Sequence, residues 1–274
     1  MAEIETSLVA LLCRTSDRAR ESGIATEAFA IELGDLIDRE PRLIGSPGLS
    51  RDARFEDDLR TSRGCLLEAG GQIDDALTAG TRPVLLAGDC SIALTTLPTV
   101  ARHRPDAYVL WLDAHADFNT PETTVSGYLG GMGLAGACGL WDAGLSSDAP
   151  LDPARVITCG VRDVEGGKQV ALERAGVVRI EHPALLSHAV AGREVFVHLD
   201  LDVLDASVLP ALFPAPGGLT EDGLSGLLHE VATSCELIGA EITGLTDPDL
   251  AGLAASIVEP LALSVELLHH GGDW

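Results

Sequence analysis

WLDAHAD, residues 111–117, begins in a short apolar run and then carries a metal-binding side chain at every second position. Alternate residues of an extended chain point to the same side, so Asp113, His115 and Asp117 are expected to converge on one point. Functional loops of parallel α/β sheets gather at the carboxyl ends of the strands, and this cluster has that place after its apolar run. The stretch therefore indicates both an α/β fold and a metal site.

A second acidic pair has the same pattern. Asp200 and Asp202 alternate at the end of another apolar run. A single Asp-x-Asp after a strand is commonly a turn or a helix cap, but two such clusters would repel each other without a cation between them. Four carboxylates and one imidazole suit Mn²⁺ or a similar divalent ion. Such a set can bridge two ions and activate water, so we predict a binuclear metallohydrolase.

The composition is that of an acidic globular protein. The 274 residues are 46% hydrophobic and 22% charged, with a formal net charge of −24. This charge repels phosphate backbones and anionic lipids, so neither nucleic acid nor a membrane is an expected partner. No apolar run reaches membrane-spanning length and no signal peptide is recognisable, so we expect a cytoplasmic protein.

The six cysteines are scattered, and no two have C-x-x-C spacing. A chain of this length needs no disulfide framework, so all of them except Cys90 are expected to be small buried hydrophobic residues. The cysteine pattern by itself therefore predicts neither a disulfide scaffold nor a soft-metal site.

Short apolar runs alternate with helical patterns from end to end, which predicts a mostly parallel sheet with helices on both faces. The expected strands are 7–12, 83–87, 107–112, 155–159, 177–180, 194–199 and 237–242. The expected helices are 51–79, 91–103, 165–175, 219–234 and 250–269. No internal repeat or linker interrupts this order, so residues 1–274 are expected to form a single domain.

Four segments, taken together, resemble the arginase–agmatinase (ureohydrolase) family. They are Gly88–Ser91, Asp113–Pro121, Thr124–Gly127 and Asp200–Thr220. The segments follow the family's order over most of the chain. The resemblance implies a three-layer α/β/α fold around an eight-stranded, mostly parallel sheet, with two Mn²⁺ ions at the strand ends that serve to hydrolyse guanidino groups.

The resemblance also implies a role for each matching residue. Six residues would hold the metals: Asp113 and Asp200 as bridges, His115 and Asp202 on one ion, Asp117 and Cys90 on the other. Asp117 would also accept a proton from the attacking water and pass it to the leaving amine. Asn119 and Ser126 match positions that bind the α-carboxylate of an amino-acid substrate, and Glu165 matches an acidic contact to its α-amino group. The implied partner is a small amino-acid substrate.

Three departures from the family pattern modify this picture. Cys90 stands where the family has a histidine ligand, and the alternative interpretation is a decayed ligand with a one-metal site. Gly130 stands where the family has the histidine that shuttles protons during arginine hydrolysis. Gly244 stands where an acidic residue pairs with the guanidinium group, and Glu241 could replace that residue only if a bulge re-aims it.

Losing a proton shuttle lowers a rate by about 10²–10⁴-fold, so arginine is expected to be a poor substrate. An N-hydroxyguanidine is less basic than a guanidine, so we expect it to need less acid assistance. Within the family, the chain most resembles the branch that hydrolyses Nω-hydroxy-L-arginine in D-cycloserine biosynthesis, which implies release of hydroxyurea and L-ornithine. Two alternatives stay open. One is an arginase or other guanidino-acid hydrolase with an unusual metal ligand, and the other is a homologue that binds a ligand or metal without turning over a substrate.

The oligomeric state follows only indirectly from the resemblance. The family commonly forms trimers or hexamers through C-terminal helices and tails. This chain stops soon after its last helical stretch, so we expect a monomer.

Overall fold

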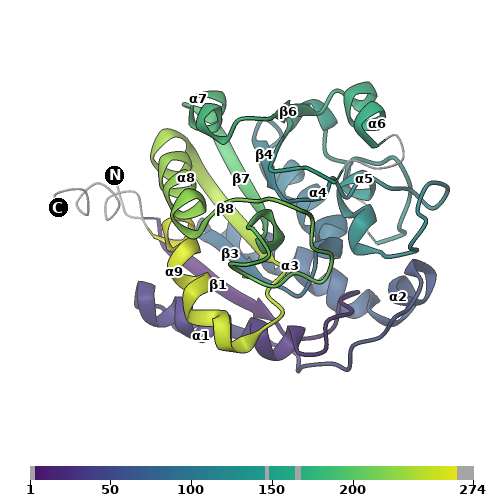
Figure 1. Ribbon diagram of the computed structural model, residues 1–274, viewed down its shortest axis with the longest axis horizontal. Coiled ribbons are helices and arrows are strands. Elements are labelled where there is room, and N and C mark those ends of the chain that lie inside the picture. Colours follow the sequence, from purple (N-terminus) through teal and green to yellow (C-terminus); the bar gives the residue numbers. More distant parts are fainter. Residues whose placement is uncertain (1–3, 146–147, 164–167, 264–274) are drawn as a thin grey trace.

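The computed structural model describes residues 4–145, 148–163 and 168–263. Its strands form one eight-stranded sheet in the order β2-β1-β3-β8-β7-β4-β5-β6, and each neighbouring pair is parallel (Figure 1). The strands are β1 (Thr6–Leu11), β2 (Arg42–Ile44), β3 (Arg82–Leu86), β4 (Tyr108–Leu112), β5 (Val156–Cys159), β6 (Val178–Ile180), β7 (Glu194–Asp200) and β8 (Glu236–Thr243). The α/β class and the parallel sheet predicted from the sequence are confirmed.

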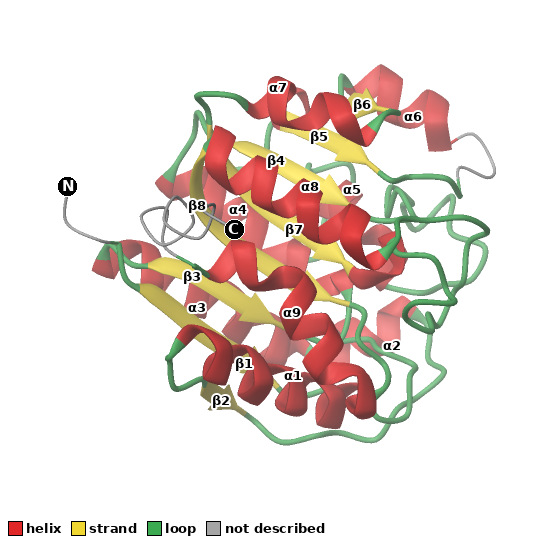
Figure 2. Cartoon of the chain, turned by 60° about the vertical axis from the view of Figure 1, so that its left-hand side comes forward, coloured by secondary structure: helices red, strands yellow, loops and turns green. Residues whose placement is uncertain are grey.

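Helices cover both faces of the sheet, which makes three layers (Figure 2). One layer contains α1 (Ser22–Ile37), α7 (Leu186–Val190), α8 (Glu221–Ser234) and α9 (Ala251–Ala262). The other contains α2 (Phe55–Thr61), α3 (Arg63–Ala79), α4 (Ala93–His103), α5 (Gly133–Ala137) and α6 (Lys168–Ala175). Strands covered on both sides have no polar face, and this is why they appear in the sequence as continuous apolar runs.

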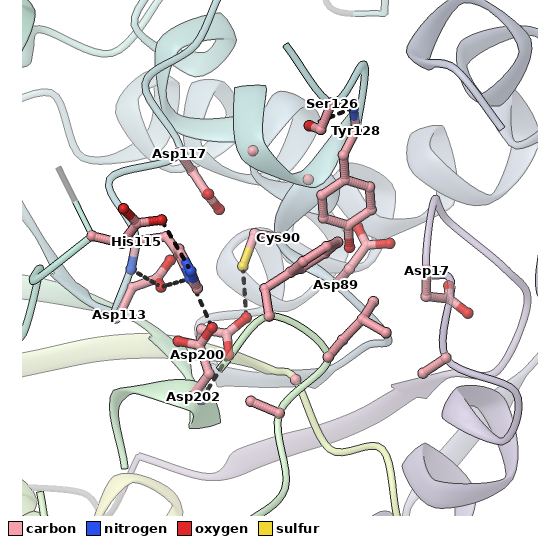
Figure 3. A pocket seen from close by; sticks show the side chains of 18 of the residues that line it. Asp17, Asp89, Cys90, Asp113, His115, Asp117, Ser126, Tyr128, Asp200 and Asp202 are labelled. Atoms are coloured by element: carbon pink, nitrogen blue, oxygen red, sulfur yellow. Dashed lines mark hydrogen bonds and ion pairs between the residues drawn. The ribbon is translucent and has the colours of Figure 1, made fainter. Parts of the chain in front are cut away.

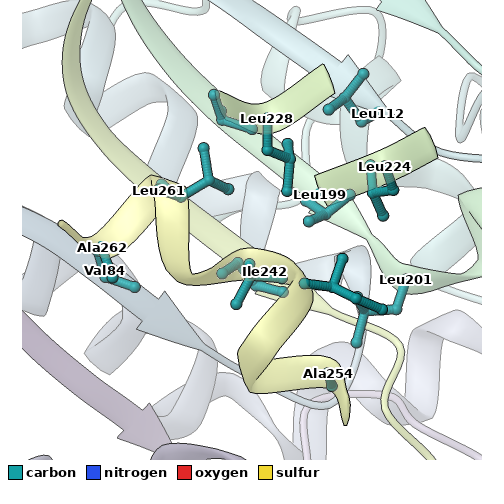
Figure 4. Packing of buried hydrophobic residues seen from close by; sticks show 14 of the residues in the cluster. Val84, Leu112, Leu199, Leu201, Leu224, Leu228, Ile242, Ala254, Leu261 and Ala262 are labelled. Carbon is teal, nitrogen blue, oxygen red and sulfur yellow. The ribbon is translucent and has the colours of Figure 1, made fainter. Parts of the chain in front are cut away.

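Successive strand residues alternate between the two apolar cores. Leu199 and Ile242 face the core under α8 and α9, where Figure 4 shows Leu224 and Leu261 packed over them. Leu85, on β3, faces the opposite core under α3 and α4. This period of two fixes which face each residue at the strand ends will occupy.

Seven strands were predicted to within one residue at each end, whereas β2, a three-residue edge strand, was not. The expected helix 51–79 is two helices, α2 and α3, separated at Ser62. Helix α1 was missed because Ile24, Ile31 and Leu36 are exposed and blur its amphipathic pattern. The short helices α5 and α7 were also missed, and the expected helices 165–175 and 250–269 extend outside the described residues.

The prediction of five buried, unpaired cysteines was wrong for Cys13, Cys65 and Cys235. Cys13 and Cys65 form a disulfide that joins the segment after β1 to α3, with Cα atoms 6.1 Å apart. The two residues are 52 positions apart, so their contact depends on how α3 packs against β1. Cys138 and Cys159 are buried as predicted, while Cys235 is partly exposed. No helix among the described residues is long and apolar enough to cross a membrane.

Candidate metal centre

The site lies where the four adjacent strands β3, β8, β7 and β4 end at one edge of the sheet. Pairing of Leu112 with Leu199 brings Asp113, the next residue after β4, beside Asp200 at the end of β7. Asp200 in turn pairs with Thr243 of β8. Strand register therefore brings together two acidic clusters that are more than eighty positions apart in the sequence.

His115, Asp113 and Asp202 form one half of the centre. His115 Nδ1 lies 2.8 Å from Asp202 Oδ2 and 3.6 Å from Asp113 Oδ1. The backbone amide of His115 donates to Asp113 Oδ1 at 2.6 Å, and that of Ala114 donates to Asp202 Oδ1 at 3.0 Å. The loop backbone thus holds both carboxylates toward the imidazole.

Cys90 and Asp200 form the other half. Cys90 begins a 3-10 turn after β3, and its Sγ donates to Asp200 Oδ2 at 3.0 Å. The Thr243 hydroxyl lies 3.3 Å from the sulfur and donates to the same carboxylate oxygen at 3.1 Å. Preceding residue Asp89 fixes the turn by accepting from the Ser91 amide at 2.8 Å.

Asp117 reaches the centre from a strained backbone. Its φ of 45° lies in the left-handed region that residues other than glycine rarely adopt, a feature that is common at functional sites. The carboxylate points into the cavity between the two halves (Figure 3), and it has no hydrogen bond to any described residue. Of the acidic side chains in the centre, it is the one left free to exchange a proton.

The electrostatics favour a bound cation. Burial and neighbouring carboxylates raise the pKa of Asp117 to about 7 and that of Asp200 to about 6, and raise the pKa of Asp113 well above its usual value. Burial alone would lower the pKa of His115, but its hydrogen bonds to Asp113 and Asp202 raise it to about 11. Raised pKa values mean that these carboxylates do not readily ionise together. A bound cation would stabilise their ionised forms.

The donor atoms also fit divalent metals. Two groups of potential ligands have their donor atoms within 4.8 Å of one another: Asp113 with His115 and Asp202, and Asp113 with Cys90 and His198. Because the groups share Asp113, one carboxylate can serve both, as a bridging ligand does. All six residues predicted as metal ligands line one pocket. Their function as ligands remains a prediction.

One row of buried side chains supports the centre from beneath. Trp111 on β4, His198 on β7 and Glu241 on β8 are neighbours in register, two residues before Asp113, Asp200 and Thr243 on the same face. Trp111 and His198 stack with centroids 3.5 Å apart, and His198 Nδ1 lies 2.6 Å from Glu241 Oε1. His198 Nε2 lies 3.3 Å from Cys90 Sγ. By the period of two, His198 shares the strand face of Asp200 but lies two residues deeper, which predicts a buried, hydrogen-bonded histidine, and the structure confirms it.

The prediction that Glu241 contacts substrate needs correction. Its side chain is fully buried, bonds to His198 and is not among the residues that line the pocket. The register shift between β7 and β8 lies at Val195 of β7. This is too far from Glu241 to turn its side chain toward the pocket. Gly244 does line the pocket, but a Cβ there would lie 2.3 Å from Asp200 Oδ1, so the backbone leaves no room for an acidic side chain.

The cavity above these side chains has a volume of about 360 Å³. Asn119 and Ser126 line its wall, consistent with their predicted contact to a substrate carboxylate. Glu165 lies outside the described residues, although Asp163, two positions earlier, lines the pocket.

Two of the pocket residues that were not predicted from the sequence bring further polar groups to it. Asp17 comes from the loop after β1, where burial and the Asp89 carboxylate raise its pKa to about 6. Tyr128 enters from the loop before α5. One sequence signal pointed to Tyr128. It is a bulky residue in the same segment as Gly130, the glycine that stands where the family has a histidine.

Comparison with known sequences identifies relatives that match part or most of the chain. Residues 51–259 match the profile described as "Arginase family". An N(omega)-hydroxy-L-arginine amidinohydrolase from Streptomyces lavendulae is 36% identical over 242 residues, which cover 86% of each chain. The arginase of Bacillus caldovelox is 35% identical over 168 residues, covering 54% of this chain and 56% of the relative.

Solved structures share the fold. The native arginase of Bacillus caldovelox superposes with a TM-score of 0.78 and 24% identity, covering 94% of this chain and 98% of that one. The arginase of Entamoeba histolytica, solved with L-ornithine, gives a TM-score of 0.82 and 18% identity over 96% of this chain and 100% of that one. At these identities the likeness concerns the fold alone.

Proposed function

We propose that this chain, which belongs to the arginase family, hydrolyses Nω-hydroxy-L-arginine to hydroxyurea and L-ornithine. The observation that carries the proposal is the convergence of four aspartates, one histidine and one cysteine on the floor of a single pocket. The 36% identical relative named for this substrate supports the choice within the family. The bond cleaved would be that between the guanidino carbon and the side-chain nitrogen that ornithine retains.

Two Mn²⁺ ions are the proposed cofactor. Asp113 and Asp200 would bridge them, with the remaining four predicted ligands divided between the two ions. When bound, such a pair would supply Lewis acidity that makes water a competent nucleophile near neutral pH. The chain's own contribution is to hold six donors in place through strand register and backbone hydrogen bonds.

Asp117 is the proposed acid–base residue. Its carboxylate faces the cavity without a hydrogen-bond partner among the described residues, so it is free to accept and release a proton. It would take a proton from the attacking water and deliver it to the departing ornithine nitrogen, so that no net proton is consumed.

The pocket favours a hydroxylated guanidine over arginine. Gly130 and Gly244 offer no side chain to assist proton transfer or to pair with a guanidinium cation. An N-hydroxyguanidine is less basic and depends less on either group. Asn119 and Ser126 would bind the substrate's α-carboxylate, and Glu165 is proposed for its α-amino group.

Side-by-side turnover of L-arginine and Nω-hydroxy-L-arginine by the Mn²⁺-loaded protein tests the proposal, scoring ornithine, urea and hydroxyurea. We expect hydroxyurea release with a kcat/KM at least about 100-fold above that for arginine. Asp117→Asn should lose about 10²–10⁴-fold in kcat, whereas Asp152→Asn, an exposed aspartate before another 3-10 turn, should not change it. Efficient urea release from arginine would instead make this an arginase with a substituted ligand.

We further propose that the protein acts as a cytoplasmic monomer with a small amino acid as its only partner. Light scattering on the Mn²⁺-loaded protein checks the oligomeric state. A mass of three or six chains would contradict the monomer.

A further inference from the structure

Tyr128 occupies the space in which a side chain at position 130 would begin. A Cβ added to Gly130 would lie 2.6 Å from Cε1, 2.7 Å from Cζ and 2.9 Å from the hydroxyl oxygen of Tyr128. Gly130 opens a 3-10 turn, a conformation that any residue adopts, so glycine is needed here for room rather than for its backbone freedom. The absence of a histidine at position 130 and the presence of the Tyr128 ring are therefore linked, because the ring fills the space that the histidine side chain would need.

The ring of Tyr128 is fixed from its outer side. It packs against Phe213 with centroids 5.1 Å apart, and the Arg18 guanidinium lies 5.0 Å from the ring centroid. Its backbone amide donates to Ser126 Oγ at 3.2 Å. Phe213 and Arg18 thus contact the ring, and its hydroxyl is directed into the pocket.

The hydroxyl of Tyr128 lies inside the pocket. Figure 3 shows the ring descending toward Asp89 and Cys90, and Tyr128 lines the same cavity as the predicted metal ligands. No described residue makes a hydrogen bond to this hydroxyl, although the carboxylates of Asp89 and Asp17 are close enough to affect it. Burial and these negative charges raise the pKa of Tyr128 well above its usual value, so the group stays a neutral phenol.

We infer that Tyr128 is a specificity-determining residue, whose hydroxyl hydrogen-bonds the Nω-hydroxyl of a bound hydroxyguanidine. This inference rests on the proposed function and extends it by naming the group that recognises the distinguishing atom. A neutral phenol both donates and accepts, which matches an N-hydroxyl that does the same.

The same geometry discriminates against arginine. An unhydroxylated guanidinium has donors but no acceptor, so it cannot accept the phenol's proton. Sites built to hydrogen-bond a substrate hydroxyl reject analogues that lack it, because their own polar group is then left unpaired. Tyr128, whose ring fills the space of the missing proton-shuttle histidine, thus favours a different substrate.

The test compares Tyr128→Phe with the wild type on both substrates, using the Mn²⁺-loaded protein. Phenylalanine keeps the ring contacts and removes only the hydroxyl. We expect kcat/KM for Nω-hydroxy-L-arginine to fall by about 10- to 100-fold, while that for L-arginine changes less than about threefold. Dissociation constants of both amino acids, measured in an Asp117→Asn background so that turnover is slowed, should shift in the same unequal way.

Tyr108→Phe is the matched control. Tyr108 is the other tyrosine of the chain; it begins β4, contacts Arg155 and Arg193, and lies outside the pocket lining. This variant should leave both substrates unchanged. Equal losses on both substrates in Tyr128→Phe, or no loss, would overturn the role of Tyr128. A wild type that binds and hydrolyses both amino acids equally would instead overturn the proposed substrate.

A second variant tests the packing that fixes Tyr128. Gly130→Ala places a methyl group against the ring, so it should displace the hydroxyl and lower kcat/KM for the hydroxylated substrate by about tenfold or more. In a Tyr128→Ala background the same alanine should have little further effect, because the ring is gone. Equal effects of Gly130→Ala in both backgrounds would show that position 130 acts independently of Tyr128.

Discussion

Replacing His198 by leucine is expected to destabilise the protein by about 3–5 kcal/mol, because the change leaves a buried acidic side chain without its partner. His198 and Glu241 are both fully buried, with Nδ1 and Oε1 2.6 Å apart. The other carboxyl oxygen of Glu241 has no hydrogen-bond partner among the described residues. All of the side-chain hydrogen bonding of Glu241 therefore passes through His198.

The magnitude follows from what each change removes. Losing one partner of a buried pair costs about 3–5 kcal/mol, and loss of the stacking on Trp111 adds about 0.5–1.5 kcal/mol. Replacing both members by apolar residues of similar volume, His198→Leu with Glu241→Met, leaves no orphaned polar group and should cost far less. A coupling free energy of about 3 kcal/mol or more is the expected result of the double-mutant cycle.

Urea unfolding of the metal-free proteins, followed by tryptophan fluorescence, measures the four free energies of the cycle. Metal is removed because a bound ion would add its own linkage to each stability. Glu236→Gln, at the exposed start of β8, is the control and should change stability by less than about 0.5 kcal/mol. A coupling free energy below about 0.5 kcal/mol would refute the reasoning, since the two side chains would then contribute independently.

Three further predictions concern other groups. Affinity for Mn²⁺ should fall about 10- to 100-fold from pH 7.5 to 5.5 by equilibrium dialysis, because protons compete at Asp117 and Asp200, whose pKa values are about 7 and 6; unchanged affinity would contradict the proton competition. Burial raises the pKa of Asp17 from 3.8 to about 6, so its contribution to stability is present below about pH 4 and lost as the pH rises through 6. Asp17→Asn should therefore stabilise the protein by about 1–3 kcal/mol at pH 7.5 and not at pH 4, as measured by urea unfolding. Thiol titration in guanidinium should find four thiols without reductant and six with it, and six in both would contradict the Cys13–Cys65 pair.

Local periodicity predicted much of the fold and the floor of the site. The alternation of Asp113, His115 and Asp117 depends only on backbone geometry at the end of one strand, as does the depth of His198 below Asp200. Such inferences need no knowledge of which strands are neighbours. This explains why the strands and five of the predicted ligands were placed together correctly, whereas the sixth, Cys90, was named only by the family resemblance.

Features that depend on strand order or on loop packing were not predictable in this way. The contact of Glu241 with His198 requires β8 to lie beside β7, and the resemblance to a family suggested a different role for Glu241. The position of the Tyr128 ring depends on Phe213, eighty-five positions later. Neither contact leaves a periodic signal in the sequence.

The packing around Cys90 favours a site fitted to sulfur over a ligand lost from a site fitted to imidazole. Its Sγ is surrounded at 3.0–3.3 Å by Asp200, Thr243 and His198. The His198 ring cannot retreat, because it is stacked on Trp111 and hydrogen-bonded to Glu241. A histidine at position 90 would need the space that His198 fills, so an imidazole ligand there requires a smaller residue at 198. A decayed ligand would leave a gap beside the sulfur, whereas a compact cysteine and a bulky histidine beneath it fill one volume together.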